Sequence, residues 1–274
     1  MVVLIAGASG GFGKVLGNLL VDEGMTVYGT SRNPTGKENE YAFTMLAMEI
    51  TDSESVERCV DEVLEREGRI DVLINCVNEM FIGSVEEETV EEVQGLFDTN
   101  VFGALRVCKQ VLPVMRKQGG GTIVNMSSAG GLVAIPFMSA YTSAKFALET
   151  MSEALYHEVR KDGIDVVIMQ PVAMNMDRPA TGSHLRVVAN VSPDSNSLRM
   201  VTRMAKDTAA SKLTPEIVAR RVHQVITSRK KQLRVPMDRA KQITFIKRFA
   251  PQFVIDRMLA GLVRGHAPHE NSVR

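Results

Sequence analysis

The feature that most constrains the fold is the N-terminal segment, where an apolar run leads directly into a glycine-rich turn. Val2 to Ala6 is β-branched and apolar throughout, which is typical of a strand covered on both faces. The sequence GASGGFG follows, and a helix is predicted from Gly11 to Glu23, with Gly24 as its stop. Glycines at such a turn let backbone N–H groups approach a pyrophosphate at the N-terminus of the helix. A glycine turn alone is weak evidence, but this position favours nucleotide binding over a merely tight turn.

Apolar runs and amphipathic segments alternate along the rest of the chain. Further strands are predicted at residues 26–30, 43–50, 70–75, 122–125, 165–169 and 233–236. Helices are predicted at residues 51–68, 93–115, 139–160 and 214–228. This alternation predicts an α/β fold of the Rossmann type, a doubly wound parallel sheet of about seven strands with helices on both faces. We expect one domain over residues 1–274, with its ligand at the carboxyl ends of the strands.

Three predicted helices begin with residues that suit a helix N-terminus. Thr51 with Glu54, and Thr89 with Glu92, fit the capping box, in which the two side chains satisfy each other's backbone N–H groups. Thr214 followed by Pro215 fits an N-cap with proline at the first helical position. These local signals predict where each helix begins.

Tyr141 and Lys145 lie four residues apart, so a helix beginning near Ser139 places them on the same face. A phenol with its ordinary pKa of about 10 is a poor acid or base at neutral pH, and a nearby ammonium favours the phenolate. The pair therefore predicts a tyrosine whose pKa is lowered for proton transfer. The same spacing is also common on exposed surface helices, so its weight depends on its context.

The second predicted strand ends in Ser31 and Arg32, with no carboxylate at that turn. In a dinucleotide-binding fold an Asp or Glu there accepts from the ribose 2′-hydroxyl, whereas an Arg pairs with a 2′-phosphate. The pattern therefore favours NADP(H) over NAD(H). The alternative is that Arg32 is a solvated loop residue.

Together, these motifs resemble the short-chain dehydrogenase/reductase family. The resemblance rests on GASGGFG, on Asn100 in a long helix, on Ser128 thirteen positions before Tyr141 and on YTSAK, all in family order within residues 1–175. It implies that Tyr141 is the acid or base, that Ser128 bonds the reacting oxygen, and that Lys145 binds the nicotinamide ribose and lowers the Tyr141 pKa. Asn100 would hold water for a proton relay.

The resemblance also implies which residues contact the cofactor, NADP(H). They are Gly7, Ser9, Gly11, Phe12, Gly13, Ser31, Arg32, Glu49, Ile50, Asn75, Tyr141, Lys145, Pro171 and Met174. Hydride chemistry belongs to the cofactor, so the protein has to provide a proton and orientation.

Four positions depart from the family pattern. Ala6 replaces the usual Thr, which predicts a looser glycine turn, and Glu49 replaces an Asp that faces adenine. The segment 75–78 lacks the usual Gly, which puts side chains where backbone normally nears the cofactor. Met176 replaces a Thr that meets the nicotinamide carboxamide. These changes leave open a cofactor-binding regulator as an alternative to an enzyme.

The C-terminal third leaves the common pattern. Residues 178–212 are polar and lack periodicity, which is typical of a lid over a binding site or of disorder. Residues 240–264 alternate apolar and basic side chains and suit a cover on the pocket, a subunit contact or a membrane-surface helix, of which we favour the first two.

The composition of the chain limits the kinds of binding partner that we expect. The 274 residues carry 32 basic and 32 acidic side chains, which argues against nucleic acid, and no stretch is long enough to cross a bilayer. Cys59, Cys76 and Cys108 read as reduced thiols in a cytoplasmic protein, and the five His lack metal-ligand spacing, so no metal is predicted. We expect a homodimer or homotetramer.

The expected reaction is NADPH-dependent hydride transfer between the cofactor and a carbonyl or secondary alcohol. A hydrophobic ketone, steroid-, retinoid- or lipid-like, is suggested by apolar residues near the nicotinamide end: Met80, Phe81, Phe137, Met138, Met174 and Met176. Ordinary core filling explains the same residues as well. An NAD-dependent alcohol dehydrogenase is a further alternative.

Overall fold

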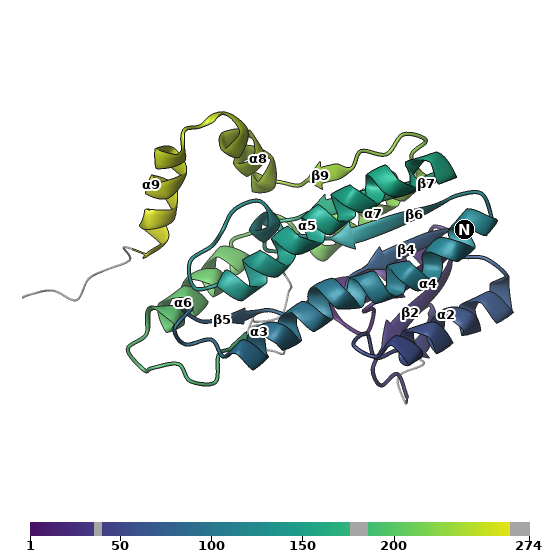
Figure 1. The fold of residues 1–274 in the computed structure, drawn as a ribbon, viewed down its shortest axis with the longest axis horizontal. Helices are drawn as coiled ribbons and strands as arrows, with labels where there is room; N and C mark the ends of the chain where they lie inside the picture. The colour runs from purple at the N-terminus through teal and green to yellow at the C-terminus, as the bar shows by residue number, and fades with distance from the viewer. Residues whose placement is uncertain (36–39, 176–185, 264–274) are drawn as a thin grey trace, which may run out of the picture.

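A computed structural model describes residues 1–35, 40–175 and 186–263. Its centre is a parallel sheet of seven strands in the order β3-β2-β1-β4-β6-β7-β9. In that order the strands are Thr44–Ala47, Thr26–Ser31, Val2–Ala6, Val72–Asn75, Gly121–Met126, Ile164–Gln170 and Arg234–Pro236. The strand order reverses between β1 and β4, as in a doubly wound sheet, where ligands bind outside the carboxyl ends of the strands. The predicted fold class is confirmed (Figure 1).

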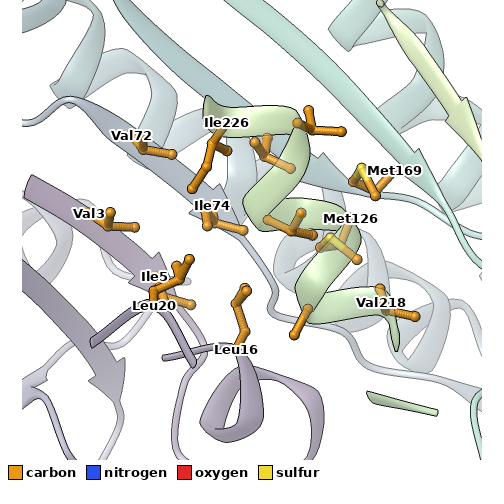
Figure 2. Packing of buried hydrophobic residues seen from close by; sticks show 14 of the residues in the cluster. Val3, Ile5, Leu16, Leu20, Val72, Ile74, Met126, Met169, Val218 and Ile226 are labelled. Carbon is orange, nitrogen blue, oxygen red and sulfur yellow. The ribbon is translucent and has the colours of Figure 1, made fainter. Parts of the chain in front are cut away.

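Helices cover both faces of this sheet. Helices α1 (Gly11–Asp22) and α7 (Pro215–Thr227) pack on one face, where Val3 and Ile5 of β1 are fully buried (Figure 2). Leu4 and Ala6 point to the opposite face, which is covered by the helices α2 (Ser53–Glu67), α4 (Gly103–Lys117) and α5 (Ser139–Val159). Because successive strand residues alternate between faces, burial on both sides explains the continuous apolar run of β1.

The helix starts agree with the predictions in two cases of three. Thr89 forms the predicted capping box with Glu92 at the start of α3 (Val90–Phe97), and Thr214 caps α7. The Thr51–Glu54 box is wrong, because Asp52 is the N-cap of α2 and its carboxylate accepts from the Glu54 N–H. Aspartate is as good a cap as threonine, so the helix starts one residue later.

The long helix predicted at residues 93–115 is divided. A π-helical turn, Asp98–Phe102, joins α3 to α4 and carries Asn100. Such single π-turns place one extra residue in the helix and are frequent at functional sites. Short 3-10 turns also occur at Ala129–Gly131 and Arg160–Asp162.

The segment predicted to be an irregular lid is ordered in part. Residues 178–185 lie outside the described residues, but β8 (Arg186–Val187) pairs in parallel with β5 (Phe81–Ile82), and α6 (Asn196–Ala209) follows. The prediction of irregular structure is therefore wrong for residues 196–209. The inner face of α6 begins with the buried Ser197, a polar residue that interrupts the apolar pattern. The helical period then continues through Met200, Val201 and Met204.

The predicted C-terminal amphipathic segment forms two helices, α8 (Arg239–Phe249) and α9 (Gln252–Val263). Pro251 separates them, because the residue before a proline is disfavoured in helical conformation. The pair projects from one end of the molecule (Figure 1), and α9 is tied to α6 through Arg203, which donates to the Gly261 carbonyl at 3.2 Å. None of the helices in the described part of the chain is long and apolar enough to cross a membrane.

Candidate active site

The glycine turn after β1 is shaped by close backbone contacts. Gly7 has φ +88°, and a Cβ there would lie 2.8 Å from Cγ2 of Val77. A Cβ on Gly13 would lie 2.2 Å from the Gly7 carbonyl oxygen. Helix α1 then begins at Gly11 without a side-chain cap among the described residues, so its first N–H groups face the turn. This uncapped helix end fits the phosphates of a dinucleotide.

Two side chains from elsewhere in the chain brace this turn. The Gly7 N–H donates to the Thr30 hydroxyl at 3.1 Å, and the Tyr41 hydroxyl donates to the Ser9 carbonyl at 2.9 Å. The Thr30 hydroxyl thus gives the turn a side-chain hydrogen bond although Ala6 itself has no hydroxyl. Sequence reasoning missed both partners, because each lies more than twenty positions from the residue it holds.

The residues predicted to hold the adenosine half lie at the ends of β2 and β3. Ser31 ends β2, and Arg32 follows it with an exposed side chain. The Glu49 carboxylate accepts from both the backbone N–H and the hydroxyl of Thr51, at 3.1 and 2.8 Å. Ile50 is buried and packs against Gly103, so closely that a Cβ on Gly103 would overlap the Ile50 side chain.

Asn75 ends β4 with its side chain turned into the sheet. Its Nδ2 donates to Oδ1 of Asn125 on β6 at 2.7 Å, and Asn125 donates onward to the Ser152 hydroxyl at 2.8 Å. The Asn75 amide therefore ties two central strands together, and any contact with the cofactor is left to its backbone.

The remaining predicted cofactor residues lie on both sides of the sheet's carboxyl edge. Phe12 and Met174 pack against the core cluster shared by α1 and α7. The Pro171 carbonyl, just after β7, accepts from the Ala129 N–H at 2.9 Å. Met176 lies outside the described residues.

Tyr141 and Lys145 lie on α5 and are both buried, Lys145 being 2% exposed. The Lys145 Nζ is 5.7 Å from the centre of the Tyr141 ring and donates to the Met126 carbonyl at 2.9 Å. Burial lowers the pKa of Lys145 to about 8, against the opposing effects of Cys76 and Glu149. The helical spacing thus brings the two groups together.

The pKa expected for Tyr141 is wrong in this structure. Burial raises the pKa of Tyr141 above its ordinary value, and only the hydrogen bond with Ser128 opposes this rise. Lys145 is itself desolvated and donates one N–H to the Met126 carbonyl. Its charge therefore does not offset the effect of burial on the Tyr141 pKa. The phenol is therefore in its protonated form at neutral pH.

Ser128 and Ser127 face different ways, because successive residues at a strand end point to opposite sides. The Ser128 Oγ accepts from the Gly130 N–H at 3.1 Å and forms the hydrogen bond with Tyr141. The Ser127 Oγ is buried and has no hydrogen-bond partner among the described residues. The geometry joins Ser128, not Ser127, to Tyr141.

Asn100 lies in the π-helical turn with both ends of its amide engaged. Its Nδ2 donates to the Glu79 carbonyl and its Oδ1 accepts from the Glu79 N–H, each at 2.7 Å. The side chain anchors the loop after β4, so a water in a relay would have to be held by the Asn100 backbone.

Three carboxylates between β4 and the first turn of α3 hold the segment that follows the undescribed residues. Arg186 pairs with Glu79 at 2.8 Å, the Ala189 N–H donates to Glu92 at 3.1 Å, and the Ser197 hydroxyl donates to Glu87 at 2.5 Å. We call residues 186–200, which pack on the Tyr141 cluster through Val188 and Met200, the cover segment. Hydrogen bonds from Ser195 and Ser197 lower the pKa of Glu87 to about 2. Sequence reasoning assigned Glu92 only to the Thr89 capping box and missed Glu79 and Glu87, and the acidic run 86–88 was the only signal for Glu87.

Four of the six apolar residues suggested for the substrate lie around Tyr141, whereas Met174 packs against the cluster of α1 and α7 and Met176 lies outside the described residues. Phe81, Met138, Val188 and Met200 are buried in one cluster with it, and Met80 and Phe137 pack against that cluster. Phe137 has φ +63°, which is uncommon for a bulky residue. The Tyr141 end of the site is thus apolar.

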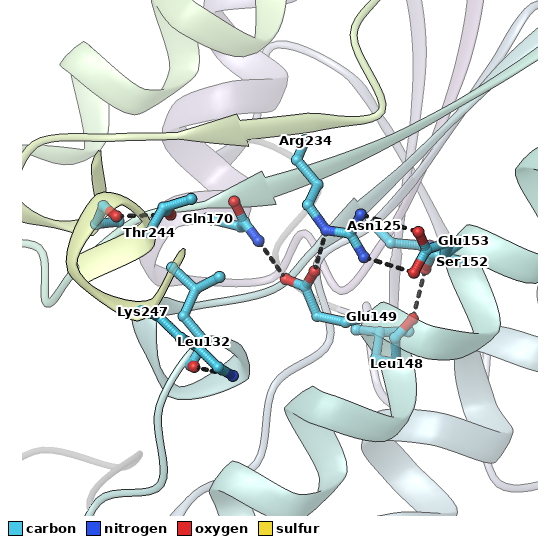
Figure 3. A network of polar contacts seen from close by, with 11 residues as sticks. Asn125, Leu132, Leu148, Glu149, Ser152, Glu153, Gln170, Arg234, Thr244 and Lys247 are labelled. Atoms are coloured by element: carbon cyan, nitrogen blue, oxygen red, sulfur yellow. Dashed lines mark hydrogen bonds and ion pairs between the residues drawn. The ribbon is translucent and has the colours of Figure 1, made fainter. Parts of the chain in front are cut away.

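Behind the pair, α5 carries a buried carboxylate one turn beyond Lys145. Glu149 accepts from the Gln170 amide at 2.8 Å and from Arg234 at 3.1 Å, and Arg234 also pairs with Glu153 (Figure 3). This network ties α5 to β7 and β9 behind Lys145.

Comparisons with known proteins agree with this arrangement. Residues 1–182 match the family model of the short chain dehydrogenases. A 3-ketodihydrosphingosine reductase of Bacteroides thetaiotaomicron is 44% identical over 174 residues, which span 64% of each chain. The oxidoreductase YbbO of Escherichia coli is 30% identical over 94% of each chain.

A solved structure extends the likeness to the whole fold. A short-chain dehydrogenase from Streptomyces avermitilis superimposes with a TM-score of 0.80 and 29% identity, covering 95% of each chain. With the matched family model and the sheet order described above, the chain belongs to the short-chain dehydrogenase/reductase family of oxidoreductases.

Proposed function

We propose that this chain is an NADPH-dependent reductase of a hydrophobic ketone, with Tyr141 as the proton donor. The observation that carries the proposal is a group of three side chains, in which the buried Tyr141 is hydrogen-bonded with the half-buried Ser128 and has the buried Lys145 ammonium 5.7 Å from its ring. Asn100, through its backbone, completes the proposed set.

The residues have distinct roles in the reduction. When bound, NADPH supplies the hydride that adds to the carbonyl carbon. Tyr141 donates its phenolic proton to the carbonyl oxygen. Its raised pKa means that the phenol carries this proton at neutral pH but is a weak acid, so the donation depends on Ser128 and Lys145 to stabilise the phenolate. Ser128 donates a hydrogen bond to the same oxygen. Lys145 stabilises the phenolate that is left and binds the nicotinamide ribose.

The preference for NADPH is supported by the end of β2. Arg32 is exposed there, free to approach a 2′-phosphate, and Ser31 leaves no carboxylate to repel one. The glycine turn, with its uncapped helix end, would hold the pyrophosphate.

The substrate we propose is a long-chain, lipid-like ketone such as a 3-keto sphingoid base. The apolar cluster around Tyr141 suits an aliphatic chain, and the Bacteroides relative is named for reduction of 3-ketodihydrosphingosine. A steroid or retinoid carbonyl is the alternative within the same class.

The test is oxidation of NADPH and NADH in the presence of 3-ketodihydrosphingosine, a steroid ketone and retinaldehyde. Replacing Tyr141 with Phe should lower kcat by about 10²- to 10⁴-fold while NADPH still binds, because only the proton donor is lost. Tyr156→Phe, on the same helix but packed in the opposite core, is the matched control and should keep full activity.

Two outcomes would contradict the proposal. If the wild type and Tyr141→Phe are equally inactive although NADPH binds, a cofactor-binding regulator is favoured instead. A strong preference for NADH would contradict the role of Arg32 and favour an NAD-dependent alcohol dehydrogenase.

A further inference from the structure

The outer side of α8 and the start of α9 carry three phenylalanines that face solvent. Phe245, Phe249 and Phe253 are 66%, 65% and 70% exposed. The rings of Phe245 and Phe249 pack together with centres 4.9 Å apart. We call these three residues the phenylalanine face. Exposed apolar side chains of this size, two of them in contact, are typical of an interaction surface.

The opposite side of α8 holds the helix against the body. Ala240 is fully buried, and Lys247 donates to the Leu132 carbonyl with its Nζ 4.5 Å from the centre of the Phe146 ring (Figure 3). These contacts fix the rotation of α8 about its axis. The phenylalanine face therefore points outward into solvent.

The same two helices are basic although the whole chain has a net charge of zero. They contain one acidic residue, Asp256, and five basic ones: Arg239, Lys241, Lys247, Arg248 and Arg257. Lys241 and Arg248 are exposed on the same side as the phenylalanine face, and the Arg248 guanidinium lies 5.5 Å from the centre of the Phe249 ring.

Aromatic rings interleaved with basic side chains match the surface of an anionic bilayer. Rings enter the boundary between headgroups and acyl chains, while Lys and Arg pair with lipid phosphates. A second copy of the chain fits less well, because a two-fold interface sets a surface against itself and would oppose Lys241 and Arg248 with like charges.

We propose that α8 and α9 dock the protein on anionic membranes through the phenylalanine face and its flanking basic residues. This proposal does not depend on the proposed reaction, since it uses none of the residues of the active site. If the substrate is a lipid-like ketone, docking also places the site at the membrane that holds it.

The test is co-sedimentation of the full chain with vesicles of phosphatidylcholine alone and of phosphatidylcholine mixed with phosphatidylglycerol. We expect binding to the mixed vesicles, weakened about tenfold or more on pure phosphatidylcholine and at high salt. The variant Phe245→Ser/Phe249→Ser/Phe253→Ser should lose binding to both. Lys241→Glu/Arg248→Glu should lose the preference for anionic vesicles.

The matched control is Val85→Ser/Val90→Ser, which removes two exposed apolar residues elsewhere. It should bind vesicles as the wild type does. Unchanged NADPH binding and melting temperature show that each variant is folded. The proposal is overturned if the wild type does not sediment with anionic vesicles, or if the triple variant binds them equally well. It is also overturned if the triple variant changes only the molar mass in solution, which would assign the face to self-association.

Discussion

The glycine turn and the cover segment are held in different ways. The turn is held by neutral groups in tight contact, with a Cβ on Gly13 only 2.2 Å from a backbone oxygen. The cover segment is held by charge, through the carboxylates of Glu79, Glu87 and Glu92. The difference indicates that the glycine turn tolerates no added volume at Gly7 and Gly13, whereas the cover segment responds to loss of charge.

The largest effect is expected when one methyl group is added to the glycine turn. Gly13→Ala should destabilise the protein by about 3 kcal/mol or more and abolish NADPH binding, because the new Cβ overlaps the Gly7 carbonyl. Thermal melting and NADPH titration measure both effects. Gly95→Ala, in α3 with nothing within 4 Å of its Cβ, is the control and should stabilise by about 0.5 to 1 kcal/mol. Equal behaviour of the two variants would refute the steric account of the turn.

Charge buried in the core should matter more than charge at the cover segment. Arg234→Met leaves the buried Glu149 without its cation and should cost about 2 to 3 kcal/mol, a value reduced because Arg234 is partly exposed. Denaturant unfolding measures it. Arg58→Met, in an exposed pair with Glu54 on α2, is the control and should cost less than about 0.5 kcal/mol. A small loss in Arg234→Met would mean that Gln170 alone satisfies Glu149.

Removing a neutral bond from the turn should have an effect that does not change with pH. Thr30→Val keeps the shape but leaves the Gly7 N–H without its acceptor, which should cost about 1 to 2 kcal/mol. The difference in melting temperature between the wild type and Thr30→Val should be the same at every pH from about 4 to about 8, which is the range around the pH at which most proteins are most stable. A pH-dependent difference would show that a titrating group also braces the turn.

The smallest effect is expected at the cover segment, and it should depend on pH. Glu87→Gln weakens the bonds from Ser84, Ser195 and Ser197 and should cost about 1 kcal/mol near neutral pH. The pKa of Glu87 is lowered to about 2, so its contribution is present above the ordinary carboxyl pKa and is lost as pH falls toward 2. The difference in melting temperature between wild type and variant should shrink over that window.

The same variant separates the two sides of the site kinetically. Glu87→Gln should raise KM for the ketone a few-fold while leaving NADPH binding unchanged. Glu86→Gln, at an exposed neighbouring position, is the control and should match the wild type. A larger change in NADPH binding than in KM would show that the cover segment acts on the cofactor side.

Much of this architecture could be predicted because its signals are local. Each of these signals depends on residues a few positions apart. The structure has the apolar run of β1, the Thr89 capping box and the helix start at Thr214 and Pro215. The approach of Tyr141 to Lys145 follows from helical spacing alone. The failures at Thr51 and α6 were also local, where a competing cap and a buried Ser obscured the pattern.

The tertiary structure determined the hydrogen-bond partners and the burial of the active-site groups. Thr30 and Tyr41 brace the glycine turn, Glu79 occupies the Asn100 amide, and Arg186 reaches Glu79 across 107 positions. The sequence by itself determined the parallel sheet, the glycine turn and the pairing of Tyr141 with Lys145. It did not determine the direction of the Tyr141 pKa shift, because desolvation depends on every element packed around the phenol, whereas the spacing of two residues depends only on the helix that carries them.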